Sequence, residues 1–159
     1  MSCLKCTCGC DGLTKEALAE VINATDRVTD FINHQTAQDM FVRRIYPDEP
    51  DTYQPQASGS RAHKKPAKPR AIKYLEYIKE ARRLLANNQA SEDDYKSFAD
   101  NIDPGLADEL CDCVDREDHA ARAAVLEDII KEYVSRLGET SDYKKFQVTL
   151  CDAYKKKYP

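Results

Sequence analysis

Four cysteines lie within the first ten residues of this chain of 159, and they are the residues best suited to chemistry. Cys3, Cys6, Cys8 and Cys10 follow the spacing C-x2-C-x-C-x-C. Thiolates are preferred zinc ligands, and four of them complete the tetrahedral coordination of a structural site. The spacing therefore predicts a structural zinc ion bound by segment 1–13. Because four ligands on one short strand force the backbone to wrap tightly, sharing the metal with distant cysteines or across a dimer is the easier geometry.

Two other interpretations of these cysteines stay open. Cysteines crowded at an N-terminus beside Leu4 and Lys5 suit S-acylation, which would anchor a peripheral membrane protein. The second residue is Ser2, whereas a myristoylation signal requires glycine there. The third interpretation is a tail of inert thiols. Seven cysteines, an odd number, and the absence of a signal-peptide core or a membrane-spanning apolar run favour reduced thiols in an intracellular protein, cytoplasmic or nuclear.

The remaining cysteines do not predict a second metal site. Cys111 and Cys113 are two positions apart, so on a helix their side chains point about 200° apart and cannot both bind one ion. Cys113 shares an apolar face with neighbouring leucines and is expected in the core, as is Cys151 beside a leucine. His119 follows two acidic residues at the start of a helix, where we expect an exposed imidazole.

The chain lacks the residue patterns that catalysis requires. It has three histidines and five glycines, and it contains no G-x-S-x-G, no G-x-x-x-x-G-K and no H-E-x-x-H. No calcium-binding loop of the EF-hand type occurs among its many carboxylates. We therefore expect a protein that is not an enzyme.

Charge is segregated along the chain. Residues 91–130 contain thirteen acidic and three basic side chains, a net charge of −10. Residues 61–73 are basic and contain no acid. This run could contact nucleic-acid phosphates or act as a nuclear-import signal, or it could be solvated and lie against the acidic segment. The candidate residues for the first two roles are Arg61, Lys64, Lys65, Lys68 and Arg70.

Proline and hydrophobic periodicity divide the rest of the chain. Five of the seven prolines fall between 47 and 69 in a polar stretch, which predicts a linker over 47–70. Before it, segment 14–46 has the spacing of one long amphipathic helix, with Thr14 as its N-cap. Such a helix has no partner within its own segment, so it must pack on the C-terminal domain or on another chain. In the second case its stripe is an interface for self-association or for another protein. The candidate interface residues are Leu18, Val21, Val28 and Ile32.

Segment 71–158 predicts a C-terminal bundle of four to five helices. Apolar residues recur at helical spacing through it, Ser91 and Asp94 form a variant of the capping box, and Gly138 is expected to end the longest helix. No alternating strand pattern occurs, so the predicted fold class is all-α. The runs Ala71–Lys79 and Tyr95–Phe98 resemble the opening of small helical interaction modules such as paired amphipathic helix and harmonin-homology domains.

These observations favour a non-enzymatic helical adaptor or assembly subunit that acts through protein–protein contacts. One alternative is a nucleic-acid-associated accessory protein with a zinc-binding N-terminus and a basic linker; a small viral or host regulatory protein would fit that description. Another is a peripheral membrane protein held by S-acylated cysteines.

The zinc hypothesis predicts about one zinc ion per chain, or per dimer where the site is shared, in protein purified without chelator. Binding requires loss of the thiol protons, so zinc should leave as the pH falls. The double variant Cys6→Ser, Cys8→Ser should lose the metal while the helices keep their melting transition. Elemental analysis is the measurement. Metal-free protein with four alkylatable N-terminal thiols would refute the site, and palmitate on those residues would establish the lipid anchor instead.

Overall fold

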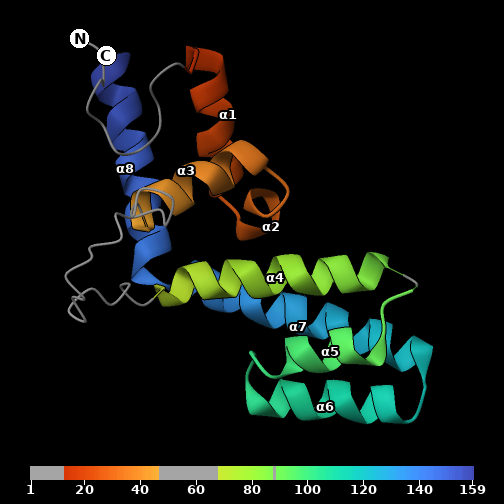
Figure 1. The fold of residues 1–159 in the computed structure, drawn as a ribbon. Coiled ribbons are helices and arrows are strands. Elements are labelled where there is room, and N and C mark those ends of the chain that lie inside the picture. The colour runs from red at the N-terminus through yellow and green to blue at the C-terminus, as the bar shows by residue number, and fades with distance from the viewer. Residues whose placement is uncertain (1–12, 47–67, 88) are drawn as a thin grey trace, which may run out of the picture. The chain divides into compact units, whose positions relative to one another are not determined.

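The computed structural model of the chain describes residues 13–46, 68–87 and 89–159. Every regular element within them is a helix, which confirms the predicted all-α class (Figure 1). The helices are α1 (Lys15–Thr25), α2 (Val28–Phe31), α3 (Gln35–Ile45), α4 (Arg70–Ala86), α5 (Glu92–Ala99), α6 (Pro104–Asp115), α7 (His119–Glu139) and α8 (Ser141–Lys157). Nearly all of the predicted Cys-rich segment and linker lies outside the described residues.

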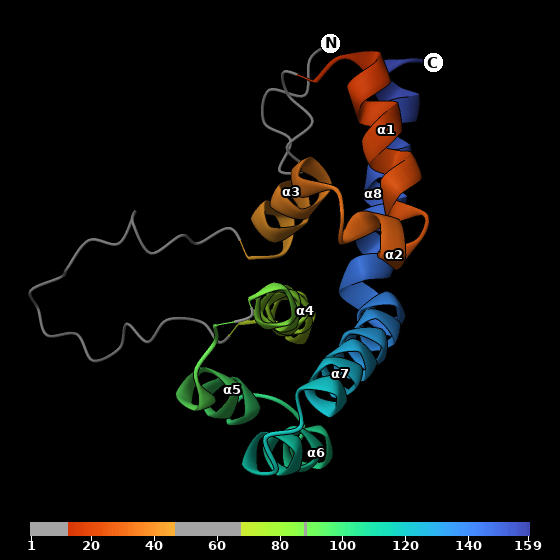
Figure 2. The ribbon, with the colours of Figure 1, turned by 90° about the vertical axis from the view of Figure 1, so that its right-hand side faces the viewer.

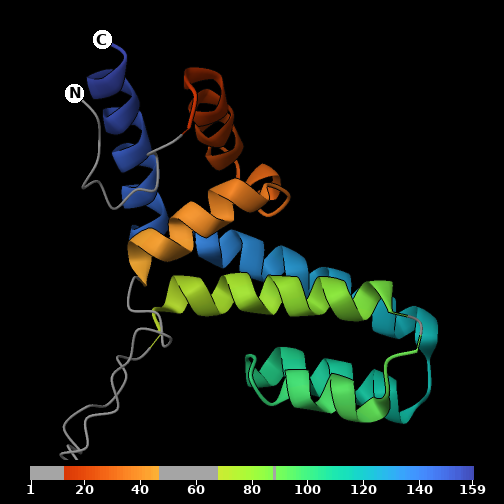
Figure 3. The same cartoon turned by 45° about the horizontal axis from the view of Figure 1, so that its top comes forward.

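The helices belong to two compact units. The first unit consists of α1, α2, α3 and α8, and in it α8 packs against both α1 and α3 (Figure 3). The second unit, residues 73–140, consists of most of α4 together with α5, α6 and α7 (Figure 2). Segment 71–158 does contain five helices, as predicted. The last of them, however, lies in the unit of the N-terminal helices, so the compact units differ from the expected division of the chain.

Segment 14–46 forms three helices in place of the one long helix that its periodicity predicted. α1 ends at Thr25, and Arg27 then takes an extended conformation before α2. His34 is also extended, and its ring nitrogen accepts a hydrogen bond from the backbone N–H of Ala37 to cap α3. The side chains of Thr25 and Asn33, next to these breaks, donate to nearby carbonyls and so compete with a continuous helix. The breaks fold α3 back on α1 and α2.

Four aromatic side chains form the centre of the first unit. Phe31 and Phe41 lie edge to face with their ring centroids 5.4 Å apart. Phe31 makes a similar contact with Tyr143 at 5.2 Å, and Phe41 with Phe146 at 5.2 Å. All four are fully or almost fully buried. Such pairs add to the burial of their large apolar area, so they hold α8 on the N-terminal helices.

A carbonyl group at the end of α1 is bound by the same face of α8. The hydroxyl of Tyr143 and the side-chain amide of Gln147 both donate to the carbonyl oxygen of Thr25, each at 2.6 Å. Carbonyls in the last turn of a helix have no partner within the helix, and a buried one must find a donor elsewhere. The two donors from α8 satisfy this group, so polar and aromatic contacts fix the same junction.

In the second unit, α7 is the longest element and Tyr133 lies at its centre. The Tyr133 ring is buried against Tyr74 and Tyr77 of α4, with centroids 5.3 and 5.0 Å away. Its hydroxyl accepts a hydrogen bond of 2.9 Å from the backbone N–H of Asp103, directly before α6. One tyrosine therefore ties α4 and the start of α6 to α7, while α6 also packs on α5 and α7.

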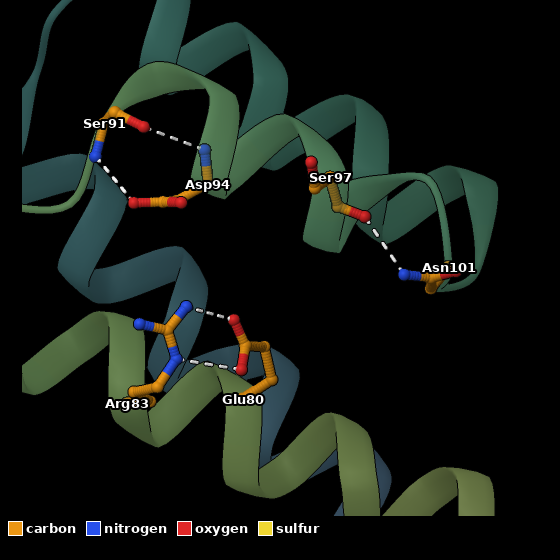
Figure 4. Close-up of polar contacts among 6 residues, drawn as sticks. All are labelled: Glu80, Arg83, Ser91, Asp94, Ser97 and Asn101. Carbon is orange, nitrogen blue, oxygen red and sulfur yellow. Dashed lines mark hydrogen bonds and ion pairs between the residues drawn. The ribbon is translucent and has the colours of Figure 1, made fainter.

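The predicted helix signals can be compared directly with the caps. Thr14 caps α1, and Ser91 and Asp94 form the reciprocal capping box of α5, drawn in Figure 4 beside the ion pair of Glu80 and Arg83 in α4. The expected stop at Gly138 is corrected, because α7 continues through Gly138 to Glu139. The helix ends where Thr140 turns extended and its hydroxyl donates to a carbonyl of the last turn.

Tyr143→Phe should remove the hydroxyl and keep the ring. Gln147 still donates to Thr25, so we expect the free energy of unfolding at pH 7 to fall by about 1 kcal/mol. Burial, and then the charges of Asp26 and Asp30, raise the pKa of Tyr143 above its ordinary value of 10.0. Its contribution is therefore fully present below pH 10 and is lost as the pH rises further. Urea unfolding of both proteins should show a difference that shrinks above pH 10; an unchanged difference would contradict this role.

Candidate functional site

The described residues contain only part of the sites predicted from sequence. Cys3, Cys6, Cys8 and Cys10 lie outside them, as do Arg61, Lys64 and Lys65 of the basic run. Lys68 and Arg70 are described, and both side chains are exposed at the start of α4. In the described part of the chain, no group of three or more His, Cys, Asp or Glu side chains is placed to hold a metal ion.

The candidate interface on segment 14–46 is divided by the structure. Leu18 and Val21 are fully buried in the core of the first unit, whose α1 packs against α8, so neither side chain can contact another molecule without unfolding. Val28 and Ile32 are half-buried. The periodicity correctly identified the buried face of α1, and α8, which belongs to segment 71–158, covers it. Only the stretch around α2 offers part of the stripe to a partner.

The three described cysteines have different environments. Cys113 is buried, as predicted from its apolar face. Cys111 is half-buried, and burial, followed by the nearby charge of Asp115, raises the pKa of its thiol. Cys151 was expected in the core and is exposed, because α8 turns Leu150 and Ala153 inward and the position between them faces solvent. His119 is exposed, as predicted.

Helices α5 and α6 carry a set of exposed carboxylates that we call the acidic surface. Its members are Glu92, Asp93, Asp100, Asp108, Glu109, Asp112 and Asp115. Two of them take part in ion pairs, since Lys96 lies 3.3 Å from Asp115 and Arg116 lies 3.3 Å from Asp112. Both pairs are exposed to solvent and leave the surface strongly negative. Glu92 and Asp93 also lie in the first turn of α5, where the helix dipole favours negative charge.

A pocket of about 350 Å³ lies within the second unit. α4, the residues after it, α5 and the first two turns of α7 form its wall. Leucine and alanine side chains share the lining with those of an asparagine, a tyrosine, a histidine and an arginine, and none of the lining residues carries a carboxylate. The lining residues are Leu84, Leu85, Asn87, Ala90, Tyr95, His119, Arg122, Ala123 and Leu126.

Arg122 is the charged residue of this pocket, and it is 92% buried, since only 8% of its surface is exposed. Its Nη2 donates to the carbonyl oxygen of Val114 at 3.3 Å, and the ring of Tyr95 lies 5.1 Å from the guanidinium carbon. The buried Nε has no hydrogen-bond partner. Among the described residues, no carboxylate forms an ion pair with Arg122. A guanidinium has five N–H donors, so most of its hydrogen-bonding capacity is unused.

The turn between α6 and α7 positions this arginine through a strained residue. Glu117 has φ 53°, in the left-handed region that glycine usually occupies at helix ends. Its N–H donates to Val114 and the N–H of Asp118 donates to Cys113, which together form the Schellman motif that closes α6. The Asp118 carboxylate then caps α7. The turn sets the direction in which α7 starts, and hence where His119 and Arg122 lie.

Sequence reasoning did not single out Arg122, although a signal was present. Arg122, Leu126, Ile129, Tyr133 and Leu137 follow one another at steps of three and four along α7, and all five are buried. A basic residue in register with an apolar stripe is unusual in a surface helix, because arginine is rarely fully buried without a partner. The strained Glu117 had no comparable signal, because nothing in a glutamate predicts a left-handed backbone.

Comparison with models of protein families, with characterised proteins and with solved structures gives no match to this chain. Among the helices of the described residues, none has the length and apolar character to cross a membrane. The candidate site therefore has to be interpreted from its own geometry.

Glu117→Gly should stabilise the second unit. A left-handed residue with a Cβ costs about 1–2 kcal/mol, part of which is returned as the greater entropy of the unfolded glycine chain, so we expect a gain of about 1 kcal/mol. Denaturant unfolding is the measurement. Glu117→Ala is the matched control, because it removes the same carboxylate but keeps the Cβ. An equal gain in both variants would assign the effect to charge and contradict the backbone explanation.

Proposed function

We propose that this protein is a non-enzymatic adaptor or assembly subunit that binds a basic segment of a protein partner on the acidic surface. The observation that carries the proposal is the exposure of seven carboxylates on α5, its C-cap Asp100 and the adjoining α6; among the described residues, Lys96 and Arg116 are the cations that pair with them. The absence of catalytic motifs from the sequence supports the non-enzymatic part.

The charge of this surface selects the class of partner. Carboxylates that lie within a Debye length of one another, about 8 Å at physiological ionic strength, add their potentials. The summed field repels the phosphates of nucleic acid and attracts segments rich in lysine and arginine. Such complementarity raises the association rate and excludes wrong partners more than it raises affinity. A basic protein segment is therefore the ligand that the surface fits best.

The helices beneath the surface are well ordered by local interactions. The capping box of Ser91 and Asp94 fixes the start of α5, and the side chain of Asn101 bonds to the carbonyl of Ser97 at its end (Figure 4). Asp103 caps α6 through the N–H of Gly105, directly after the proline that opens the helix. A rigid framework keeps the carboxylates apart and in place, so little ordering entropy is lost on binding.

The test is affinity capture with the full chain and a charge-reversal variant. Asp108→Lys with Glu109→Lys changes two exposed members of the acidic surface that neither cap a helix nor form one of the ion pairs given above. Glu127→Lys with Asp128→Lys is the matched control, because it makes the same change in net charge on exposed positions of α7. A specific partner should bind wild type and control alike, and should bind the Asp108/Glu109 variant about tenfold more weakly.

The purified partner must then show this difference in a direct titration, and its binding must weaken as salt rises. Equal binding of the partner to the Asp108/Glu109 variant and to the Glu127/Asp128 control would show that the acidic surface is not the interface. Capture that nuclease treatment abolishes would favour the nucleic-acid alternative. Pelleting with membranes that hydroxylamine abolishes would favour the S-acylated alternative.

A further inference from the structure

The pocket around Arg122 has the features of a binding site that the acidic surface does not explain. Residues of α4, α5 and α7 line it, and they combine leucine and alanine side chains with a single buried cation. Its volume of about 350 Å³ lies at the small end of the range for ligand sites. We propose that it binds a small carboxylate with an apolar body, whose charged group pairs with Arg122.

Arg122 is a cation that is almost entirely removed from water. Removing a cation from water costs several kcal/mol unless an anion or several acceptors replace the solvent. In the described residues one carbonyl, that of Val114, accepts from the guanidinium, and the Tyr95 ring covers one of its faces. The buried Nε has no acceptor. A carboxylate would supply two acceptor oxygens to a planar fork of donors, which is the geometry that guanidinium groups bind best.

The acidic residue one helical turn before Arg122 already caps a helix. Asp118 lies one turn before Arg122, but its carboxylate accepts the N–H of Ala121 as the cap of α7. It is not among the residues that line the pocket, and neither is Glu117. The positive end of the α7 dipole lies at the same place and adds to the potential of the arginine. Within the pocket the local charge is therefore positive, although the unit as a whole is acidic.

The rest of the lining selects the body of the ligand. Leu84, Leu85 and Leu126, with two alanines, present apolar surface, and burial of apolar ligand area against it is favourable. The polar side chains of the lining are those of Asn87, Tyr95 and His119, besides Arg122. A single guanidinium matches one monoanion, whereas a phosphate dianion would bury a second negative charge without a second cation. A carboxylate on an aryl or branched alkyl group fits both parts of the pocket.

Titration of the full-length protein with 3-phenylpropionate, followed by isotope-edited NMR, tests the proposal. The neutral 3-phenylpropanamide is the matched probe, because it has the same body and lacks the charge. We expect saturable shifts at the amides of pocket residues such as Ala123 and Leu126, with a dissociation constant for the acid about tenfold or more below that of the amide. Equal binding of the two probes, shifts elsewhere in the chain, or the absence of saturable binding would each overturn it.

Variants of Arg122 test whether its charge causes the preference for the acid over the amide. Arg122→Met keeps a long apolar stem against Tyr95 and removes the guanidinium, and it should abolish the preference for the acid. Lys131→Met, which removes an exposed cation from the same helix outside the pocket, should leave the preference intact. If Arg122→Met fails to fold by its melting curve, Arg122→Lys keeps the charge without the planar fork and should reduce the preference. Retention of the full preference in a folded Arg122 variant would overturn the assignment.

The same assay distinguishes two sources of the carboxylate. A free acid and the C-terminal residue of a peptide present the same group on an apolar body. Acetyl-Ala-Ala-Phe with a free C-terminus, compared with its amidated form, separates the two. Tighter binding of the free peptide than of 3-phenylpropionate would assign the pocket to peptide C-termini, and weaker binding would assign it to free acids.

Discussion

The first unit depends on the satisfaction of one buried carbonyl. α1 ends at Thr25, whose carbonyl oxygen accepts hydrogen bonds from Tyr143, 118 positions later, and from Gln147. Without these donors the buried oxygen would be unpaired, at a cost of about 1–3 kcal/mol, beside the contacts that Phe31 and Phe41 make with α8. These hydrogen bonds join α1 to α8. In the sequence, residues 73–140, which form the second unit, therefore lie between the two segments of the first unit.

The sequence predicts which faces of these helices are buried, but not which helices cover them. Hydrophobic spacing correctly placed Leu18 and Val21 inward, and local chemistry correctly placed the caps at Thr14 and Ser91. Periodicity says nothing of the partner, so packing of the α1 stripe on the C-terminal domain and packing on another chain both stay open in the sequence, and α8 is the helix that covers it. The breaks at Arg27 and His34 depend on how α3 folds back, which is tertiary information that overrides a helical pattern.

The candidate site, too, could be predicted from the sequence only in part. The acidic surface could be predicted from the composition of 91–130, because charge is a property of the residues themselves. Arg122 could have been found by its register with Leu126 and Ile129, but the missing acceptor at its Nε could not, since that depends on what α5 and α6 place around it. The left-handed Glu117 was beyond prediction, and strain of this kind persists only where the surrounding contacts over-determine it.

The second unit has negative charge on its surface and a buried cation, Arg122, and solvent and salt screen these charges to different extents. The carboxylates of α5 and α6 are solvated, so salt screens them and each contributes little to stability. Arg122 is shielded from solvent, so its field is strong over a few ångströms and only weakly affected by salt. A basic partner on the surface and a carboxylate in the pocket would therefore not compete for the same charge. The strained turn at Glu117, which joins α6 to α7, connects the two sites physically.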